Sequence, residues 1–457
     1  MSKKINCISN RVCMTIGYRI VKEAAPALIS ILGKQKFEMG GEYRISDFTI
    51  MVNCEEGILY HSCLTGELIV VTDRVCAYQY LVEHWFIVSS DIDEKSKLPN
   101  IKKLLRCLSK KQKKGYKTFE VITTTSCNAR CYYCYESGFR HMSLSHETAE
   151  KVIDFIHLNR CSNRIKLKWY GGEPLMNVKA IDEICEGLLA KEITFKSTMI
   201  SNGILFSDEV ITKAKRLWNL QNVRITLDGT KNVYNATKNY KNYVGNPYQK
   251  VLNNIDNLLS NGISVTIRLN IEDKNILDVK VLIRLLSDKY RGNNLLDFML
   301  RPLNNTSTNN QIESIGRSRD NILKEITLMK DKLFEEGFLV NCGKLTGLTL
   351  CSCIADSGKY IAIKPNGELA YCSSDFDSKT FGSVYSKSPV IPFPELSKQP
   401  HEKQAICNDC PLFPICSPSK LCPACLKPIC NDMQKTYNIE DVKLTMKKEY
   451  RISKTKF

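Results

Sequence analysis

Three cysteines, Cys127, Cys131 and Cys134, directly follow the apolar run FEVITTT (119–125) and could all face one centre from a single loop. A closed structural metal site needs four ligands, and no fourth cysteine stands nearby, so one coordination position is left open. On zinc, an open position indicates catalytic zinc. On a [4Fe–4S] cluster, it leaves one iron free to bind a substrate. The spacing therefore predicts a reactive metal centre.

Short β-rich runs alternate with amphipathic helical patterns from residue 118 onward. Ser145 and Ser207 are predicted to cap two of these helices. Six β-then-α units predict a parallel α/β sheet with helical crossovers, either open or part of a barrel. The six runs are FEVITTT (119–125), IKLKWYGG (165–172), STMISNG (197–203), NVRITLDG (222–229), ISVTIRLN (263–270) and DFMLRPL (297–303).

Polar and glycine residues stand at the carboxyl ends of these strands, where both architectures place their ligands. We expect them to converge on one rim of the sheet with the three cysteines. In chain order they are Gly171, Gly172, Glu173, Ser201, Asn202, Asp228 and Arg268.

The composition is that of a soluble globular protein, with 457 residues, 43% hydrophobic and 25% charged. This length predicts two or three domains. No apolar run reaches the roughly 18–20 residues of a membrane span, and the first residues lack the apolar core of a signal peptide. We therefore expect a cytoplasmic protein without membrane contact. Because disulfides are uncommon in reducing cytosol, the 21 cysteines indicate metal or Fe–S ligation.

The net charge of +17 raises the possibility of a nucleic-acid partner, but Lys and Arg are spread along the chain and no nucleic-acid module is recognisable. We therefore expect no nucleic-acid partner. The densest basic run, KKQKK at 110–114, is interpreted as a solvated linker. An acidic peptide would also suit a basic surface.

The C-x3-C-x2-C spacing, with Tyr133 just before the third cysteine, resembles the signature of the radical S-adenosylmethionine (radical SAM) enzymes. The sequence GGEP at 171–174 resembles a cofactor-binding motif of the same family, and the match spans roughly 118–305. The resemblance implies that Cys127, Cys131 and Cys134 hold a [4Fe–4S] cluster. Its fourth iron would chelate the amine and carboxylate of S-adenosylmethionine (SAM).

The resemblance also assigns the rim residues to cofactor binding, together with Tyr133. Gly171 and Gly172 would let backbone approach the methionine moiety, and Glu173 would bind its amino group. The ribose side would be contacted by Ser201 and Asn202, and the carboxylate would pair with Arg268. The alternatives are a simple turn for GGEP and ordinary strand-end roles for Asp228 and Arg268.

The cysteine-rich tail, with ten cysteines between 342 and 430, resembles the SPASM domain of radical SAM enzymes that modify peptides. Cys353, Gly367 and Cys372 fit its first part, and the segment IAIKPNGELAYC is predicted to be a β-hairpin turning at Asn366–Gly367. The family's gaps of two and five residues are matched by Cys407, Cys410 and Cys416. The third gap is not, because position 420 is Lys and the next cysteine is Cys422.

This resemblance implies two auxiliary [4Fe–4S] clusters. Cys407, Cys410, Cys416 and Cys430 would hold one of them, with Cys425 as the alternative to Cys430. A zinc ion bound by four cysteines is the alternative to an Fe–S cluster in the tail. The other cluster would use Cys353, Cys372 and Cys422, with either Cys342 or Cys351.

Three domains follow from these patterns. Residues 1–115 form an α+β module with a hairpin turn at Thr65–Gly66; it either recognises a peptide leader by strand addition or caps the barrel. Residues 116–341 form a partial (β/α)6 barrel, and residues 342–457 form the SPASM domain. The expected fold class is α/β.

The function implied is reductive cleavage of SAM, hydrogen abstraction from a precursor peptide, and oxidative modification of that peptide, such as a thioether cross-link at Cys. A donor such as ferredoxin or flavodoxin would supply the electron. One alternative is the sulfatase-maturing branch, whose members carry Asp after the cysteine that matches Cys372. Here Ser373 stands at that position, and Asp375 is the nearest candidate for a catalytic residue. A non-catalytic Fe–S electron carrier or zinc-stabilised binding protein is the alternative from another class.

Overall fold

The structure, a computed structural model, describes residues 17–110, 115–303, 319–349, 357–373, 380–386, 405–416 and 430–454. All six predicted strands of the central sheet are present, parallel and paired in chain order. The expectation of a parallel α/β architecture is therefore confirmed. The strands are β7 (Thr118–Thr124), β8 (Arg164–Gly171), β9 (Thr194–Ser201), β10 (Leu220–Thr226), β11 (Ser264–Ile271) and β12 (Leu296–Pro302).

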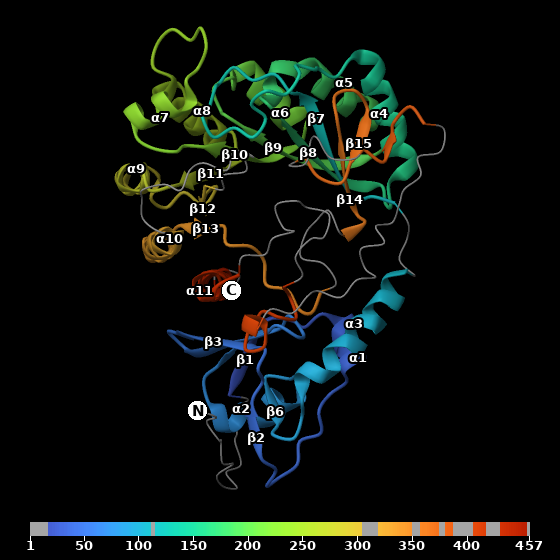
Figure 1. The fold of residues 1–457 in the computed structure, drawn as a ribbon, viewed down its shortest axis with the longest axis vertical. Coiled ribbons are helices and arrows are strands. Elements are labelled where there is room, and N and C mark those ends of the chain that lie inside the picture. Colours follow the sequence, from blue (N-terminus) through green and yellow to red (C-terminus); the bar gives the residue numbers. More distant parts are fainter. Residues whose placement is uncertain are drawn as a thin grey trace.

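Helices lie along the outer side of this curved sheet (Figure 1). Both predicted caps are confirmed, since Ser145 Oγ accepts the N–H of Thr148 at 3.1 Å and Ser207 Oγ accepts the N–H of Val210 at 3.3 Å. The helices are α4 (His146–Asn159), α5 (Val178–Ala190), α6 (Asp208–Arg216), α7 (Lys231–Lys238), α8 (Pro247–Ser260), α9 (Ile276–Tyr290) and α10 (Arg319–Glu335).

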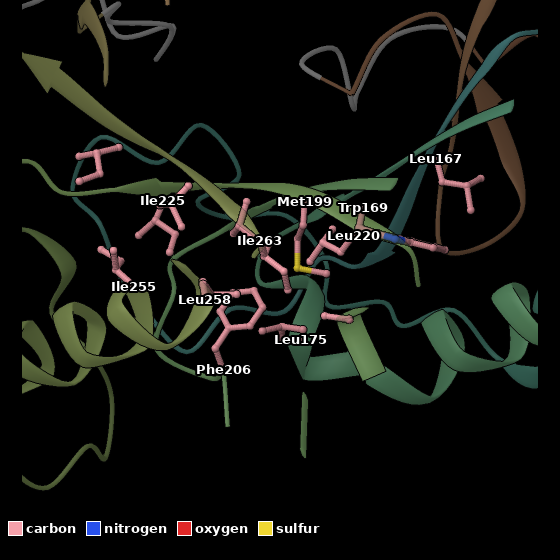
Figure 2. Close-up of a cluster of buried hydrophobic side chains, with 14 of the residues drawn as sticks. Leu167, Trp169, Leu175, Met199, Phe206, Leu220, Ile225, Ile255, Leu258 and Ile263 are labelled. Carbon is pink, nitrogen blue, oxygen red and sulfur yellow. The ribbon is translucent and has the colours of Figure 1, made fainter. Parts of the chain in front are cut away.

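The main hydrophobic core fills the space between sheet and helices. Figure 2 shows Trp169, Met199 and Ile225, from three neighbouring strands, on the side of the sheet where the helices lie. Each of these side chains is at most 1% exposed. Because side chains alternate along a strand, the residues between them face the opposite, concave side of the sheet.

The tail extends the same sheet. Strand β14 (Tyr360–Ile363) pairs in parallel with β7, and β15 (Glu368–Ala370) completes the predicted hairpin. Gly367 at its turn has a φ of +82°, a left-handed conformation that favours glycine. Together with β16 (Gly382–Ser383) and β13 (Leu339–Val340), the sheet reaches ten strands. The first part of the tail is thus continuous with the barrel sheet.

The N-terminal module has a four-stranded antiparallel sheet in the order β1-β5-β4-β3 and a separate pair, β2-β6. The hairpin at Thr65–Gly66 joins β4 to β5. The last helix runs to Lys110, so the start of the predicted linker is helical, and residues 111–114 lie outside the described residues. The elements are β1 (Tyr18–Lys22), α1 (Pro26–Leu32), β2 (Tyr43–Ile45), β3 (Thr49–Cys54), β4 (Gly57–Ser62), β5 (Leu68–Val71), α2 (Arg74–Glu83), β6 (Ile87–Ser89) and α3 (Glu94–Lys110).

Helix α11 (Asp432–Lys454) lies between this module and the barrel (Figure 1). It packs on α10 on one side and on β1, β3 and β4 on the other. Met446 and Tyr450 of α11 share a buried cluster with Leu64 and Leu68 of the module. In the part of the chain that the structure describes, no helix is long and apolar enough to span a bilayer.

Candidate functional site

The three cysteines of the predicted cluster lie on the loop that follows β7. Their side chains are half-buried, and the N–H of Cys134 donates to the carbonyl of Cys131 at 3.1 Å. Burial, together with the nearby Glu173 carboxylate and the two other thiols, raises the pKa of Cys127 to about 12. Thiols in this setting lose their protons when a bound metal compensates the negative charge. This donor set therefore fits a [4Fe–4S] cluster.

Gly171 and Gly172 let the end of β8 lie directly against the cysteine loop. A Cβ at Gly171 would come within 2.1 Å of the Thr124 carbonyl oxygen, and one at Gly172 within 2.4 Å of the Ser126 carbonyl oxygen. Two short backbone hydrogen bonds join the segments, from Gly172 N–H to Thr124 at 3.0 Å and from Glu173 N–H to Ser126 at 2.9 Å. The close approach of strand and loop therefore requires glycine at both positions, whether or not a cofactor binds there.

The Glu173 carboxylate joins the ends of β8 and β9 and is fully buried. It accepts hydrogen bonds from Ser201 Oγ at 2.9 Å, from the N–H of Asn202 at 2.7 Å and from the N–H of Leu175 at 3.1 Å. Burial raises the pKa of Glu173 to about 7, although these hydrogen bonds oppose the shift. Its hydrogen-bond donors in this structure come from the protein, so binding of an amino group by Glu173 remains a prediction.

Ser201 and Asn202 connect this carboxylate to the cysteine loop. The Ser201 hydroxyl, which is buried, donates to Glu173 and accepts the N–H of Gly203 at 3.0 Å. The amide of Asn202 donates to Asn128 Oδ1 at 2.7 Å and lies 3.9 Å from Cys127 Sγ. The predicted ribose contacts are untested, and the structure gives both residues a role in positioning Cys127.

Tyr133, next to Cys134, is anchored to the ends of two strands. Its hydroxyl donates to Asp228 Oδ2, and Asn270 Nδ2 donates to that hydroxyl at 3.4 Å. Asp228, which is buried, also accepts the N–H of Asn270 at 2.9 Å. Asp228 was predicted to lie on the rim and Tyr133 to bind the cofactor, and the structure brings the two side chains into contact.

Lys238 is the buried cation of the site. Its Nζ lies 3.5 Å from Asp228 Oδ2 and donates to the Tyr133 hydroxyl at 3.3 Å. Burial opposes the charge of this lysine, but Tyr133, Asp228 and Cys131 outweigh burial and raise its pKa above the ordinary value. A positive charge is therefore held beside the cysteine loop.

Arg268 is linked to the cysteine loop indirectly, through Asn270 and Tyr133. Its Nε donates to Asn270 Oδ1 at 2.8 Å, and Asn270 in turn contacts Tyr133. The predicted pairing of Arg268 with a cofactor carboxylate is untested.

Sequence reasoning missed Asn128, Lys238 and Asn270. Asn270 could have been found, because it stands two residues after Arg268 on the same face of a strand.

Four tail cysteines predicted to share a cluster are brought together. Burial raises the pKa of Cys416 to about 11, and the neighbouring Cys410, Cys430 and Cys407 add to the shift. The segment 405–416 is a compact set of turns, in which the N–H of Cys416 donates to Leu412 at 2.7 Å. Cys430 comes from the residues just before α11. The structure therefore places near one another the four thiols that the resemblance assigned to one cluster.

The other predicted tail cluster is only partly covered by the described residues. Its candidate ligands are Cys353, Cys372 and Cys422, with either Cys342 or Cys351. Cys372 lies near Tyr360, whose hydroxyl donates to Glu120 on β7. Cys342 lies near Asp441, and burial is the main cause that raises its pKa to about 12. The remaining candidates for this part of the chain, Cys351, Cys353, Cys422, Cys425 and Asp375, lie outside the described residues.

Among the described residues, no three Cys, His, Asp or Glu side chains converge closely enough to bind a single metal ion. The cysteines of a [4Fe–4S] cluster bind different irons, so they surround a body larger than one ion.

Comparison with known proteins agrees with this geometry. Residues 121–286 match the model of the radical SAM superfamily. An uncharacterized protein of Methanocaldococcus jannaschii is 30% identical over 131 residues, which are 28% of this chain and 44% of that protein. The Fe-coproporphyrin III synthase of Methanosarcina barkeri is 27% identical over 170 residues, which are 36% of this chain and 40% of that protein. The chain thus spans less than half the length of these curated relatives.

Solved structures share the fold over a larger part of the chain. Native anSMEcpe with bound AdoMet and Kp18Cys peptide has a TM-score of 0.57 at 14% identity, over 74% of this chain and 99% of that one. SuiB of Streptococcus suis bound to precursor peptide SuiA has a TM-score of 0.50 at 13% identity, over 82% and 94%. At these identities the likeness is one of fold. With the family match and the cysteine-bearing rim, it leads to one conclusion: the chain contains a radical SAM domain, which spans residues 121–286.

Proposed function

We propose that this protein is a radical SAM enzyme that oxidatively modifies a peptide. The observation that carries the proposal is the rim itself, where Cys127, Cys131 and Cys134 stand beside Glu173 and Asn202. When bound there, a [4Fe–4S] cluster and SAM supply a 5′-deoxyadenosyl radical, which removes a hydrogen atom from the substrate.

The residues of the chain would hold and shield this centre. Gly171 and Gly172 bring the end of β8 against the cysteine loop, and the buried Glu173 fixes the end of β9. Tyr133 ties the third cysteine to β10 and β11, while Lys238 keeps a positive charge nearby. A rim held in place by these contacts suits a reaction through a radical, which must avoid side reactions.

The four gathered thiols of Cys407, Cys410, Cys416 and Cys430 support an auxiliary cluster in the tail. An oxidised, closed-shell product requires that one further electron leave the substrate radical, and an auxiliary cluster is a suitable acceptor. In a thioether cross-link, the carbon loses its hydrogen atom to the 5′-deoxyadenosyl radical. The cysteine sulfur would lose a proton as the C–S bond forms, and the electron released would need an acceptor, which the four tail thiols could hold as an auxiliary cluster.

A peptide substrate is supported by the two solved relatives, which are bound to a Kp18Cys peptide and to the precursor peptide SuiA. The N-terminal module supports it as well, because β3 lies at one edge of the four-stranded sheet and β1 at the other. An extended leader could pair with such an edge. The alternative role of the module, as a cap on the rest of the chain, is supported by its packing on α11.

Conversion of a peptide Cys or Ser to formylglycine is the second candidate, because a relative of this fold is solved with a Kp18Cys peptide. Ser373 replaces the acidic residue expected in that branch, which favours cross-linking. For either reaction, a physiological electron donor such as ferredoxin or flavodoxin would reduce the cluster held by Cys127, Cys131 and Cys134.

One experiment tests the enzyme and separates the products. The protein is reconstituted anaerobically with iron and sulfide, reduced with dithionite, and incubated with SAM and a pool of Cys-containing peptides. We expect 5′-deoxyadenosine and a peptide that has lost two hydrogens while retaining its sulfur. A peptide aldehyde that has lost its sulfur would favour formylglycine formation. Absence of 5′-deoxyadenosine from iron-loaded protein would exclude both reactions.

A further inference from the structure

The concave face of the sheet carries polar side chains beside the proposed reaction site. On β10, Arg224 alternates with the buried Val223 and Ile225, so it points away from the helices. On β11, Arg268 alternates with the buried Ile267 and Leu269 in the same way. Figure 2 shows Ile225 on the helix side, opposite to the face that these arginines share.

The two arginines are diagonal neighbours on paired strands. Arg224 is in register with Thr266, and Thr226 is in register with Arg268. Their charges act on each other: burial lowers the pKa of Arg224, and Arg268 is the next largest cause. Two half-buried guanidinium groups at this spacing repel each other unless an anion lies between them.

Neither arginine has a carboxylate partner among the described residues, where no ion pair involves Arg224 or Arg268. Arg224 Nε is buried without a hydrogen-bond partner, and the one side-chain bond of Arg268 is the bond from its Nε to Asn270. Asp297 acts on Arg224 at longer range. An unpaired buried donor on a cation is costly, so this pair is suited to an anion from outside the chain.

Two other half-buried cations on this face have carboxylate partners. Lys168 pairs with Glu120 at 2.8 Å, and Arg301 pairs with Asp441 at 3.2 Å. Unlike Lys168 and Arg301, Arg224 and Arg268 form no ion pair among the described residues, although Asp297 of β12 acts on Arg224 at longer range.

The pair also lies within reach of the reaction site. Arg268 is joined through Asn270 to Tyr133, which directly precedes the cluster-binding Cys134. Tyr170 of β8 lies near enough to both arginines to interact with them electrostatically, and its hydroxyl lies 2.5 Å from that of Tyr135 on the cysteine loop. An anion bound here would lie near the loop whose cysteines are expected to hold the cluster.

We propose that Arg224 and Arg268 together bind the carboxylate of an Asp or Glu side chain of the peptide substrate, close to the residue that is modified. This inference rests on the proposed peptide-modifying function and names its substrate class, an acidic peptide. A planar guanidinium binds a carboxylate through two parallel hydrogen bonds, which gives direction as well as affinity.

The test uses holoenzyme with SAM and a random pool of C-terminally amidated heptapeptides with Cys at the centre. Peptides retained by the immobilised enzyme are sequenced by mass spectrometry. We expect Asp or Glu to be enriched about tenfold or more at one position near the Cys, the scale of a charge-assisted hydrogen bond. The double variant Arg224→Gln/Arg268→Gln should lose this enrichment. Lys196→Gln, which removes an exposed cation on the same face of β9, should keep it.

The same proteins are titrated with SAM alone, because the cofactor also carries a carboxylate. An unchanged SAM affinity in the double variant supports the peptide assignment. A loss of tenfold or more in SAM affinity would assign the arginines to the cofactor and overturn the proposal, as would a wild-type pool without acidic enrichment. Iron content and 5′-deoxyadenosine, measured in parallel, report failure of the proposed function separately from failure of this inference. Circular dichroism and the variant Arg224→Lys/Arg268→Lys, expected to restore part of the enrichment, control for folding.

Discussion

The buried carboxylate of Glu173 accepts the backbone N–H of Asn202 at 2.7 Å, and the amide side chain of Asn202 reaches the cysteine loop at Asn128. The rim is therefore one connected network, in which the end of β8 holds the end of β9 and both hold the loop with Cys127. A substitution at Glu173 should therefore change how firmly the cysteine loop holds the cluster, even if Glu173 does not contact the cofactor.

Replacing Glu173 by Gln should weaken this network. The Gln side chain has one acceptor oxygen for donors that now use two, and its NH2 group would face the N–H of Asn202 or Leu175. We expect a loss of about 1–3 kcal/mol in the free energy of unfolding, the cost of a buried unsatisfied group. Anaerobic urea unfolding and iron content measure it. Glu186→Gln, on the exposed side of α5, is the control and should change stability by less than about 0.5 kcal/mol. Equal stability and iron content in the two variants would contradict the network.

Gly171→Ala should reduce the iron bound at the first site, because the new Cβ would collide with the carbonyl oxygen of Thr124 and displace the cysteine loop. The matched control is Gly262→Ala. Gly262 also has a positive φ, +77°, but a Cβ there would meet nothing within 4 Å. The control therefore reports backbone strain alone. Iron per chain and the thermal midpoint are measured for both, and similar iron contents would refute the collision.

The central sheet could be predicted from the sequence, because each of its strands combines a β-rich apolar run with a following helix. Ser145 and Ser207 marked helix starts for a local reason, since a hydroxyl that caps N–H groups depends on a few adjacent residues. Gly171 and Gly172 were correctly placed on the rim. Their packing against Thr124 and Ser126 could not be predicted, because it joins two strands that are distant in sequence.

Lys238 could not be identified from the sequence for the same kind of reason. It ends a helix in which a lysine would ordinarily be exposed, and residues outside that helix, among them Tyr133 and Asp228, make its burial favourable. Spacing grouped Cys407, Cys410 and Cys416, whereas Cys430 was assigned to them only by the resemblance; it approaches them from the residues just before α11. Chain segments that meet only in three dimensions leave no local pattern.

His61 makes a prediction about pH. It is fully buried on β4, and its Nδ1 donates to the carbonyl of Glu67 at 2.9 Å. Burial lowers the pKa of His61 to about 4, below its ordinary 6.5. As pH falls from 6.5 towards 4, the unfolded chain binds a proton that the folded chain does not, so the folded state loses stability.

His61→Gln should remove this contribution, while keeping a donor for the Glu67 carbonyl. The slope of unfolding free energy against pH should decrease by up to about one proton between pH 4 and 6.5. Urea unfolding at several pH values measures it, and His146→Gln, at an exposed histidine, is the control. Unchanged slopes in both variants would mean that His61 titrates alike in the folded and unfolded states.

Iron content tests the number of clusters. Three [4Fe–4S] clusters require about twelve irons per chain after anaerobic reconstitution. Changing Cys127, Cys131 and Cys134 together to Ala should remove about a third, and Cys185→Ala, in the hydrophobic core, should remove none. Stoichiometric zinc together with about four irons per chain would exclude the auxiliary Fe–S clusters and favour a zinc site in the tail.

The gathered tail thiols make the last prediction, because they separate the two halves of the proposed reaction. Cys410→Ala or Cys416→Ala should abolish the modified peptide, while 5′-deoxyadenosine continues to form under dithionite. SAM cleavage needs only the cluster on Cys127, Cys131 and Cys134, whereas an oxidised product needs an acceptor for the last electron. Since 405–416 packs on the N-terminal module, the variants must first be compared with wild type by circular dichroism and thermal unfolding. Undiminished product from a folded variant that lacks this iron would leave the tail cluster a structural role only.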